Sequence, residues 1–187
     1  MFEAAIEKRV EVLRKVRSEM ASAFEEVSER IVGVLEAGGK IYFFGNGGSA
    51  ADAQHIATEL IDKLSRTRGT IPALALTTNT SLITAVANDK DFVHIFARQV
   101  EAYAREGDLL FGITTSGRSP NVLEAFRQGR RMGTVHVALT GADGLAEPDL
   151  ADYVLAVPSR DTQLIQEVHI GLGHLLCFVV EERLFPE

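Results

Sequence analysis

The chain of 187 residues contains one cysteine, Cys177, so an internal disulfide and a cysteine-cluster metal site are both excluded. Cys177 lies in the apolar run 175–180, where a small buried hydrophobic residue is expected rather than a nucleophile. No apolar run approaches the roughly 20 residues that span a bilayer. The first nine residues lack the basic and then apolar order of a signal peptide. We therefore expect a cytoplasmic protein without a membrane partner.

Positive charge is also scarce. The chain has 19 lysine and arginine residues against 26 aspartate and glutamate residues, a net charge of −7 at pH 7. A surface of this sign does not attract nucleic acid, so we expect no nucleic-acid partner. An anionic substrate must then be held by a local group of donors. The chain has no linker, repeat or low-complexity segment, which favours a single domain over residues 1–187.

The first part of that domain, residues 1–38, is predicted to be a helical segment that ends at Gly38-Gly39. Apolar residues recur in it mostly at three- and four-residue spacing. They are Ile6, Val10, Leu13, Met20, Phe24, Val27, Ile31 and Leu35. This apolar stripe needs a surface to cover it, and the sequence leaves open whether that surface is the same domain or a second subunit.

Residues 40–187 are predicted to form an α/β core that ends in a C-terminal helix. Short apolar runs predict strands at 41–44, 73–76, 109–113, 135–139 and 154–157. The segments around 50–64, 91–103 and 120–131 have the length of crossover helices, and a last helix is predicted at 162–184. Strands that alternate with helices predict a doubly wound, mostly parallel five-stranded sheet flanked by helices.

Two loops stand where such sheets bind ligands, beyond the carboxyl ends of strands. The first is Gly45–Ser49, and the second is Thr114–Ser119. Glycines let backbone N–H groups approach an anion, and the start of a helix adds free donors. The second loop has four hydroxyl side chains in six residues, although capping a helix needs only one. This surplus favours phosphate binding over simple capping.

The first loop also fits a dinucleotide fingerprint, because residues 45–50 match G-x-G-x-x-A. That fingerprint expects an acidic residue about 20 positions further on, at the end of the second strand. The second predicted strand is followed by Thr77, Thr78 and Asn79, which have no carboxylate to hold a ribose. The dehydrogenase interpretation is therefore disfavoured.

Titratable side chains gather on two predicted helices. His55 and Glu59 are four residues apart and share one helix face. Gln166, Glu167, His169 and His174 interrupt the apolar last helix. A histidine and a carboxylate that face one cavity could transfer protons between adjacent carbons, or could bind a divalent metal. Spacing alone does not separate these functions from structural polar residues.

Three stretches in order, 45–55, 115–119 and 165–170, resemble the sugar isomerase (SIS) domain, and within it the sedoheptulose 7-phosphate isomerases. The resemblance covers essentially the whole chain. It implies a cytoplasmic homotetramer with active sites at subunit interfaces. It also implies conversion of sedoheptulose 7-phosphate to D-glycero-D-manno-heptose 7-phosphate through an enediol, the first step towards nucleotide-activated heptose.

The resemblance further implies roles for individual residues, with Glu59 as the catalytic base and His174 as the acid. The residues implied to bind the sugar phosphate are Asn46, Gly47, Gly48, Ser49, Glu59, Asn88, Asp89, Thr114, Thr115, Ser116, Ser119 and Gln166. The implied cofactor is one Zn²⁺ per subunit, held by His55, Glu59, Gln166 and His174. Gln166 and His174 are eight residues apart, roughly 12 Å along a straight helix, so one shared ion would need them to lean together.

Some positions depart from the family pattern. Thr114 and Gln163 are unexpected residues, Lys63 replaces a frequent arginine, and Gly171 and Gly173 lower the helix propensity of the last helix. A related SIS branch binds the bacterial replication initiator and lacks the catalytic groups. Since Glu59 and His174 are both present here, the isomerase interpretation is favoured over this binding module.

Overall fold

The computed structural model of the protein describes residues 1–186, and the predicted domain boundary at Glu187 lies outside them. Five strands form one parallel sheet in the order β2-β1-β3-β4-β5. They are β1 Ile41–Gly45, β2 Ala73–Ala75, β3 Leu109–Thr114, β4 Val135–Thr140 and β5 Tyr153–Ala156. The predicted α/β class and all five predicted strands are confirmed, with ends that differ by one residue.

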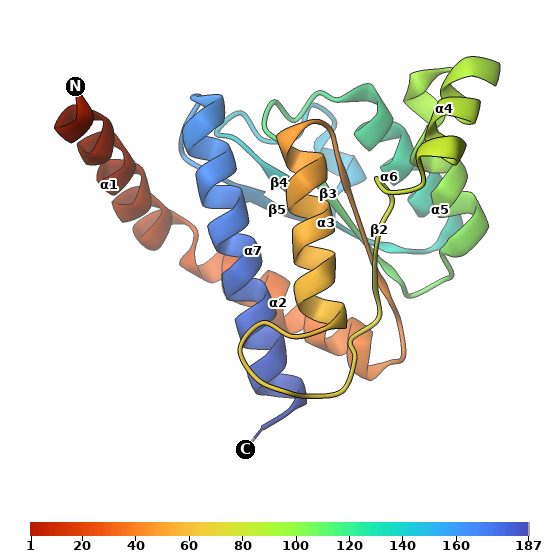
Figure 1. The fold of residues 1–187 in the computed structure, drawn as a ribbon, viewed down its shortest axis with the longest axis horizontal. Coiled ribbons are helices and arrows are strands. Elements are labelled where there is room, and N and C mark those ends of the chain that lie inside the picture. The colour runs from red at the N-terminus through yellow and green to blue at the C-terminus, as the bar shows by residue number, and fades with distance from the viewer. Residues whose placement is uncertain (187) are drawn as a thin grey trace.

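Helices cover both faces of the sheet (Figure 1). One face carries α2 (Ala21–Glu36), α3 (Gly48–Ile61) and α7 (Thr162–Leu184), and the other carries α4 (Thr80–Asp89), α5 (Ala97–Tyr103) and α6 (Pro120–Met132). Short 3₁₀ turns lie at Phe92–His94 and Pro148–Leu150. Every residue of β1, β3 and β4 is buried, which explains why these strands read as continuous apolar runs.

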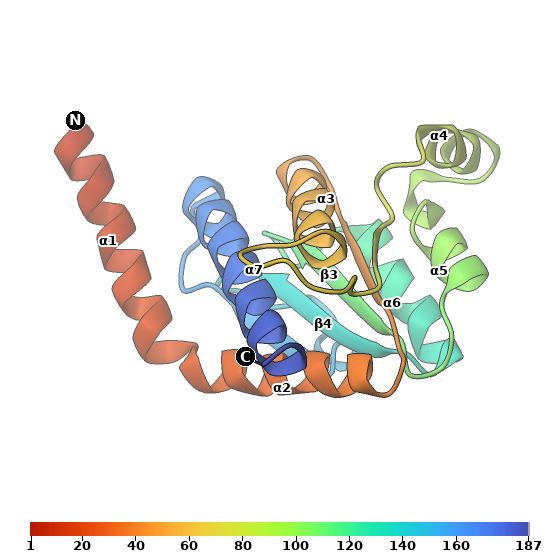
Figure 2. The ribbon, with the colours of Figure 1, turned by 60° about the horizontal axis from the view of Figure 1, so that its bottom comes forward.

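The N-terminal segment is two helices, where the sequence predicted one continuous helix. α1 (Phe2–Glu19) and α2 meet at Met20, and Figure 2 shows α1 leaving the body of the molecule at an angle to α2. Met20 is buried, and its side chain belongs to the core beneath the sheet. The apolar stripe is therefore divided: Val27 and Ile31 are buried on α2, whereas Leu13 on α1 is 55% exposed.

The segment between β2 and β3 also differs from the prediction. The expected helix at 91–103 is a 3₁₀ turn followed by the short helix α5, and α4 precedes it. Asn79 caps α4, since its side-chain oxygen accepts a hydrogen bond from the Leu82 N–H at 3.0 Å. The sequence contains this capping signal, but α4 has one buried residue, Val86, and so lacks the clear apolar period of the other helices.

α7 is long and apolar enough to cross a membrane by length and composition alone, with a mean hydropathy of 1.4 over 18 residues. This qualifies the prediction that no apolar run has that length. Ten of its 23 residues are buried in the fold, Leu176 and Val180 among them, within the core shared with α2 and α3. Packing against these elements accounts for its apolar character.

α3 and α7 pack closely because a glycine stands at their contact. A Cβ atom at Gly173 would lie 2.5 Å from Cδ1 of Ile56 on α3, closer than a side chain can approach. A Cβ atom at Gly171 would meet no atom within 4 Å. Of the two glycines that depart from the family pattern, Gly173 thus has a packing reason and Gly171 has none in the described part of the chain.

We expect these two glycines to respond oppositely to alanine. Gly173→Ala should destabilise the fold by about 1–3 kcal/mol through overpacking against Ile56. Gly171→Ala should stabilise it by about 0.5–1 kcal/mol because alanine has the higher helix propensity. Urea unfolding of both variants measures the difference. Equal effects of the two substitutions would contradict the close approach at Gly173.

A buried ion pair joins the far ends of the same two helices. Glu181 on α7 and Arg68 in the loop after α3 have side chains that are 0% and 1% exposed, with Oε1 and Nε 2.9 Å apart. Glu181 also accepts hydrogen bonds from Leu64 N–H and from the Ser65 N–H and hydroxyl. Arg68 donates to the carbonyl oxygen of Glu59 at 2.8 Å. The pair thus ties the C-terminal end of α3 to α7.

Candidate active site

The two predicted ligand loops lie side by side at the carboxyl edge of the sheet. β1 and β3 are neighbours, and the chain proceeds from them towards opposite edges, so their ends form the switch point of the sheet. The side chains of Asn46 and Asn121 join the loops through two reciprocal amide hydrogen bonds of 2.9 and 2.8 Å. The pair holds the start of α6 against the glycine loop that opens α3.

The hydroxyl side chains of the second loop, Thr114–Ser119 (the hydroxyl loop), do not cap α6. Ser119 is the N-cap residue of α6, but its side chain makes no capping hydrogen bond. Its hydroxyl lies 3.0 Å from that of Thr114, and the Ser116 hydroxyl accepts from the Arg118 N–H at 3.2 Å. Hydroxyls beyond the need of the helix start remain able to donate to an anion.

The loop after β4, residues 141–146, packs against the hydroxyl loop. Gly117 has φ +66°, and a Cβ atom there would lie 1.8 Å from the carbonyl oxygen of Gly144. The Ala146 N–H donates to the Gly117 carbonyl at 2.9 Å, and the Gly141 N–H donates to Thr115 at 3.1 Å. The loop after β4 therefore packs on the hydroxyl loop through backbone contacts that admit no side chain at Gly117.

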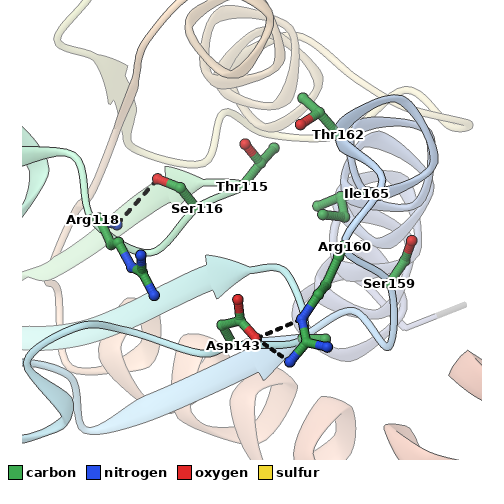
Figure 3. Close-up of a pocket in the computed structure, with 9 residues that line it drawn as sticks. Thr115, Ser116, Arg118, Asp143, Ser159, Arg160, Thr162 and Ile165 are labelled. Atoms are coloured by element: carbon green, nitrogen blue, oxygen red, sulfur yellow. Dashed lines mark hydrogen bonds and ion pairs between the residues drawn. The ribbon is translucent and has the colours of Figure 1, made fainter.

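A cavity of about 190 Å³ opens between these loops and the start of α7. Hydroxyls of Thr115, Ser116, Ser159 and Thr162 line it, as Figure 3 shows. Two of the four phosphate-binding residues predicted from the second loop, Thr115 and Ser116, thus border a cavity, whereas Thr114 and Ser119 are not part of its lining. Its charged lining, Arg118, Asp143 and Arg160, was not assigned from the sequence, although Arg118 lies inside the loop that was singled out.

The predicted acid–base residues form a compact cluster. Nε2 of His55 lies 2.8 Å from Nε2 of His174, and 3.5 Å from Oε1 of Glu59. Ligand atoms of all three residues lie within 4.8 Å of one another. His55 and Glu59 come from one face of α3 and His174 from α7, so the parallel packing of these helices creates the cluster. Two imidazole nitrogens that face each other beside a carboxylate suit a Zn²⁺ ion.

Gln166 lies near the opposite end of α7 from the ion pair, beside the glycine loop. A Cβ atom on Gly48 would be 2.6 Å from its Nε2 atom. Gln166 therefore faces the first loop, whereas His174, two turns further on, faces His55. The glycine at position 48 makes room for this amide.

A comparison with protein families identifies the chain. The SIS domain model matches residues 6–141, which include both ligand loops and His55 and Glu59. The chain belongs to the SIS domain family. The two loops and the α3 side of the cluster are thus parts of an SIS domain, and α7 follows the matched residues.

Several relatives that match this SIS domain over nearly their whole length are named phosphoheptose isomerase. A phosphoheptose isomerase of Roseiflexus sp. (strain RS-1) is 47% identical over 97% of this chain and 92% of that protein. A phosphoheptose isomerase of Paramagnetospirillum magneticum is 50% identical over 97% of this chain and 94% of that protein. The solved structure of a phosphoheptose isomerase from Francisella tularensis has a TM-score of 0.93, 35% identity, and coverage of 97% and 96%.

Two predicted substrate residues of the SIS domain lie apart from the rest. Asn88 and Asp89 are exposed at the end of α4, where the Asn88 amide donates to Asp89 at 2.8 Å. Figure 1 places α4 at the opposite side of the molecule from α7. Within one chain these residues are therefore not brought to the α3–α7 cluster.

Two further titratable side chains in the SIS core have no assigned role. Burial lowers the pKa of His169 to about 4, so the ring is neutral, and Nε2 lies 3.0 Å from the Thr140 carbonyl oxygen. Burial raises the pKa of Asp52 on α3, although His55 acts in the opposite direction. His169 is a structural residue of α7 that contacts the end of β4. Asp52 belongs to the surroundings of His55, and its spacing of three residues from His55 is the signal that could have indicated this.

Proposed function

We propose that the protein is a phosphoheptose isomerase, an aldose–ketose isomerase that converts sedoheptulose 7-phosphate to D-glycero-D-manno-heptose 7-phosphate. The observation that carries this proposal is the cluster of His55, Glu59 and His174, which sets a carboxylate and imidazoles within 4.8 Å. The hydroxyl loop offers a phosphate site at the same edge of the sheet. The names of full-length relatives support the substrate.

The reaction proceeds through a cis-enediol. Glu59 removes a proton from C1 of the ketose while His174 gives a proton to the carbonyl oxygen on C2, and both oxygens of the resulting enediol are hydroxyls. His174 then takes the proton of the C1 hydroxyl as Glu59 returns a proton to C2, which gives the aldose. A base and an acid on opposite helices suit this exchange.

The sugar phosphate is held at both ends. The side chains and N–H groups of Thr114, Thr115, Ser116 and Ser119 take the phosphate. Asn46, Gly47, Gly48, Ser49 and Gln166 contact the sugar between the phosphate and the cluster. Gly48 and His55 are separated by roughly 10 Å along α3, and this separation supports a sugar that extends from the glycine loop to the cluster.

Zn²⁺ is the proposed cofactor, held by His55, Glu59 and His174. Gln166, which faces the glycine loop, would become a fourth ligand only if its side chain turned towards the cluster. When bound, the ion supplies polarisation of the sugar oxygens. The two imidazole nitrogens 2.8 Å apart fit such an ion, because each offers a lone pair when it is neutral. Glu59 then serves both as ligand and as base.

We also propose a cytoplasmic homotetramer built from single domains of residues 1–187, with sites completed between subunits. Leu13 on α1 and Leu175 and Phe178 on α7 are 55%, 53% and 46% exposed, which provides apolar surface for other copies. Asn88 and Asp89, remote from the cluster in their own chain, would reach the sugar bound by a neighbouring subunit.

Incubation with sedoheptulose 7-phosphate in deuterated water tests the function. We expect the aldose to form with deuterium at C2, because Glu59 exchanges its proton with solvent. Fructose 6-phosphate and ribulose 5-phosphate serve as comparison substrates. Chelation should abolish turnover, re-addition of Zn²⁺ should restore it, and light scattering should give the mass of a tetramer. Absence of both aldose and label would end the proposal, whereas full activity after verified metal removal would end only its zinc part.

The alternative is a non-catalytic SIS protein that binds the replication initiator. Since Glu59 and His174 stand together with His55 in one cluster, the alternative leaves their arrangement without a purpose. The alternative predicts no turnover of sedoheptulose 7-phosphate in that assay, together with binding to the replication initiator in a separate binding measurement.

A further inference from the structure

The charged rim of the phosphate cavity contains two arginines in different electrostatic situations. Nε and Nη2 of Arg160 donate to the same oxygen of Asp143, at 2.9 and 2.7 Å. Among residues 1–186 no carboxylate lies within salt-bridge distance of the Arg118 guanidinium. Figure 3 shows the Arg118 side chain extending from the hydroxyl loop towards Asp143.

Asp143 is ionised, and its negative charge therefore repels an anion in the cavity. Its hydrogen bonds to Arg160 and the charge of Arg160 hold the pKa of the carboxyl below its ordinary value, and Arg118 adds to the shift. The cavity thus has one positive charge in excess, in a chain whose net charge is −7. That excess is the local device needed to bring a phosphate dianion to this edge.

We propose that Arg118 is a specificity-determining residue that selects the phosphate dianion, and that Asp143 tunes this selection by restraining Arg160. The inference rests on the proposed function, because it takes the hydroxyl loop as the phosphate site. Arg118 stands two residues from Ser116 and one from Ser119 on that loop, so its guanidinium has a short path to an anion held there. Arg160, neutralised by Asp143, contributes little in its present position.

This arrangement predicts effects of opposite sign from neighbouring residues. Arg118→Gln removes the unpaired cation. Arg160→Gln leaves Asp143 as an uncompensated negative charge beside the anion. Asp143→Asn removes that negative charge and frees Arg160 to turn to the cavity. An ion pair far from the anion would give no such ordered pattern, because salt screens charges that lie more than about 10 Å away.

Calorimetric titration with inorganic phosphate at low ionic strength measures these effects. We expect Arg118→Gln to raise Kd about three- to fivefold and Arg160→Gln to raise it about twofold. Asp143→Asn should lower Kd about twofold, and 0.5 M KCl should remove most of each difference. Arg131→Gln, an exposed arginine at the other end of α6, is the matched control and should bind as the unsubstituted protein does.

Two results would overturn the inference: unchanged phosphate affinity in Arg118→Gln, or weaker binding in Asp143→Asn. The measurement needs no catalysis, so it separates the inference from the proposed function. If the variants bind phosphate in the expected order but the protein does not isomerise the sugar, the role of Arg118 is supported and the proposed isomerase function is refuted. In an active isomerase, Arg118→Gln should raise KM for the phosphorylated sugar and leave kcat within about twofold, since the rim is remote from the reacting carbons.

Discussion

Glu59→Gln is expected to lower kcat by about 10²–10⁴-fold, the usual contribution of a general base. The amide retains the shape and size of the carboxylate but cannot accept the C1 proton. Nε2 of His55 lies 3.5 Å from Glu59 Oε1 and 2.8 Å from His174, so the imidazole pair stays in place when the charge is removed. Stopped assays with sedoheptulose 7-phosphate, together with the deuterium content of recovered ketose, measure the loss.

His174→Gln is the informative comparison for this substitution. Without His174 the protons of the oxygens move slowly, but Glu59 can still exchange the carbon-bound proton. Deuterium should therefore enter the ketose at C1 in His174→Gln and stay absent in Glu59→Gln. If Glu59→Gln keeps more than a tenth of the activity and still exchanges deuterium, another group is the base, and Asp52 is the next carboxylate to test because burial raises its pKa.

Glu181→Gln is expected to destabilise the protein by about 3–5 kcal/mol, because it leaves the Arg68 guanidinium buried without its counter-charge. Glu182→Gln is a matched control one residue away. Glu182 pairs with Arg66 at the surface, with a side chain that is 44% exposed, and its loss should cost about 1 kcal/mol or less. Urea unfolding followed by circular dichroism gives both values. Equal stability of the two variants would contradict the burial of the ion pair.

The pH dependence provides a second test of the same residue. Burial raises the pKa of Glu181, but hydrogen bonds from Leu64 and Ser65 and the charge of Arg68 outweigh it, so the pKa is lowered overall. A lowered carboxyl pKa stabilises the fold at pH values above the ordinary pKa of the group, and this stability is lost as pH falls through the lowered value. Glu181→Gln should lose less stability than the unsubstituted protein over that acidic range.

The sheet and its loops were predictable because their signals are local. Continuous apolar runs mark β1, β3 and β4 as strands buried on both faces, and glycines or hydroxyls follow where the strands end. The spacing of His55 and Glu59 indicated one helix face, and the cluster confirms that they lie together. Local patterns are thus sufficient for the sheet and for two of the three cluster residues.

Features that depend on contacts between distant segments were not predictable. Arg68 and Glu181 are 113 residues apart, and a lone arginine and glutamate in a sequence are expected at the surface. The break between α1 and α2 at Met20 has no proline or glycine to mark it in the sequence. The packing of Met20 in the core accounts for the break. The approach of His174 to His55 depends on the parallel packing of α3 and α7. The family resemblance implied that the two residues share a site, but their spacing in the sequence could not indicate it.

The tight backing of Gly117 by Gly144 constrains how this protein could be re-engineered. A backbone carbonyl occupies the space of a side chain at Gly117, so the hydroxyl loop cannot be lengthened or given a bulkier residue there on its own. A graft of the segment 114–119 from another sugar-phosphate enzyme would have to bring its own partner for residues 141–146. Sequence change in the two segments is therefore coupled, and new substrate preferences are more easily acquired through α3 and α7, where side chains rather than main chains form the walls.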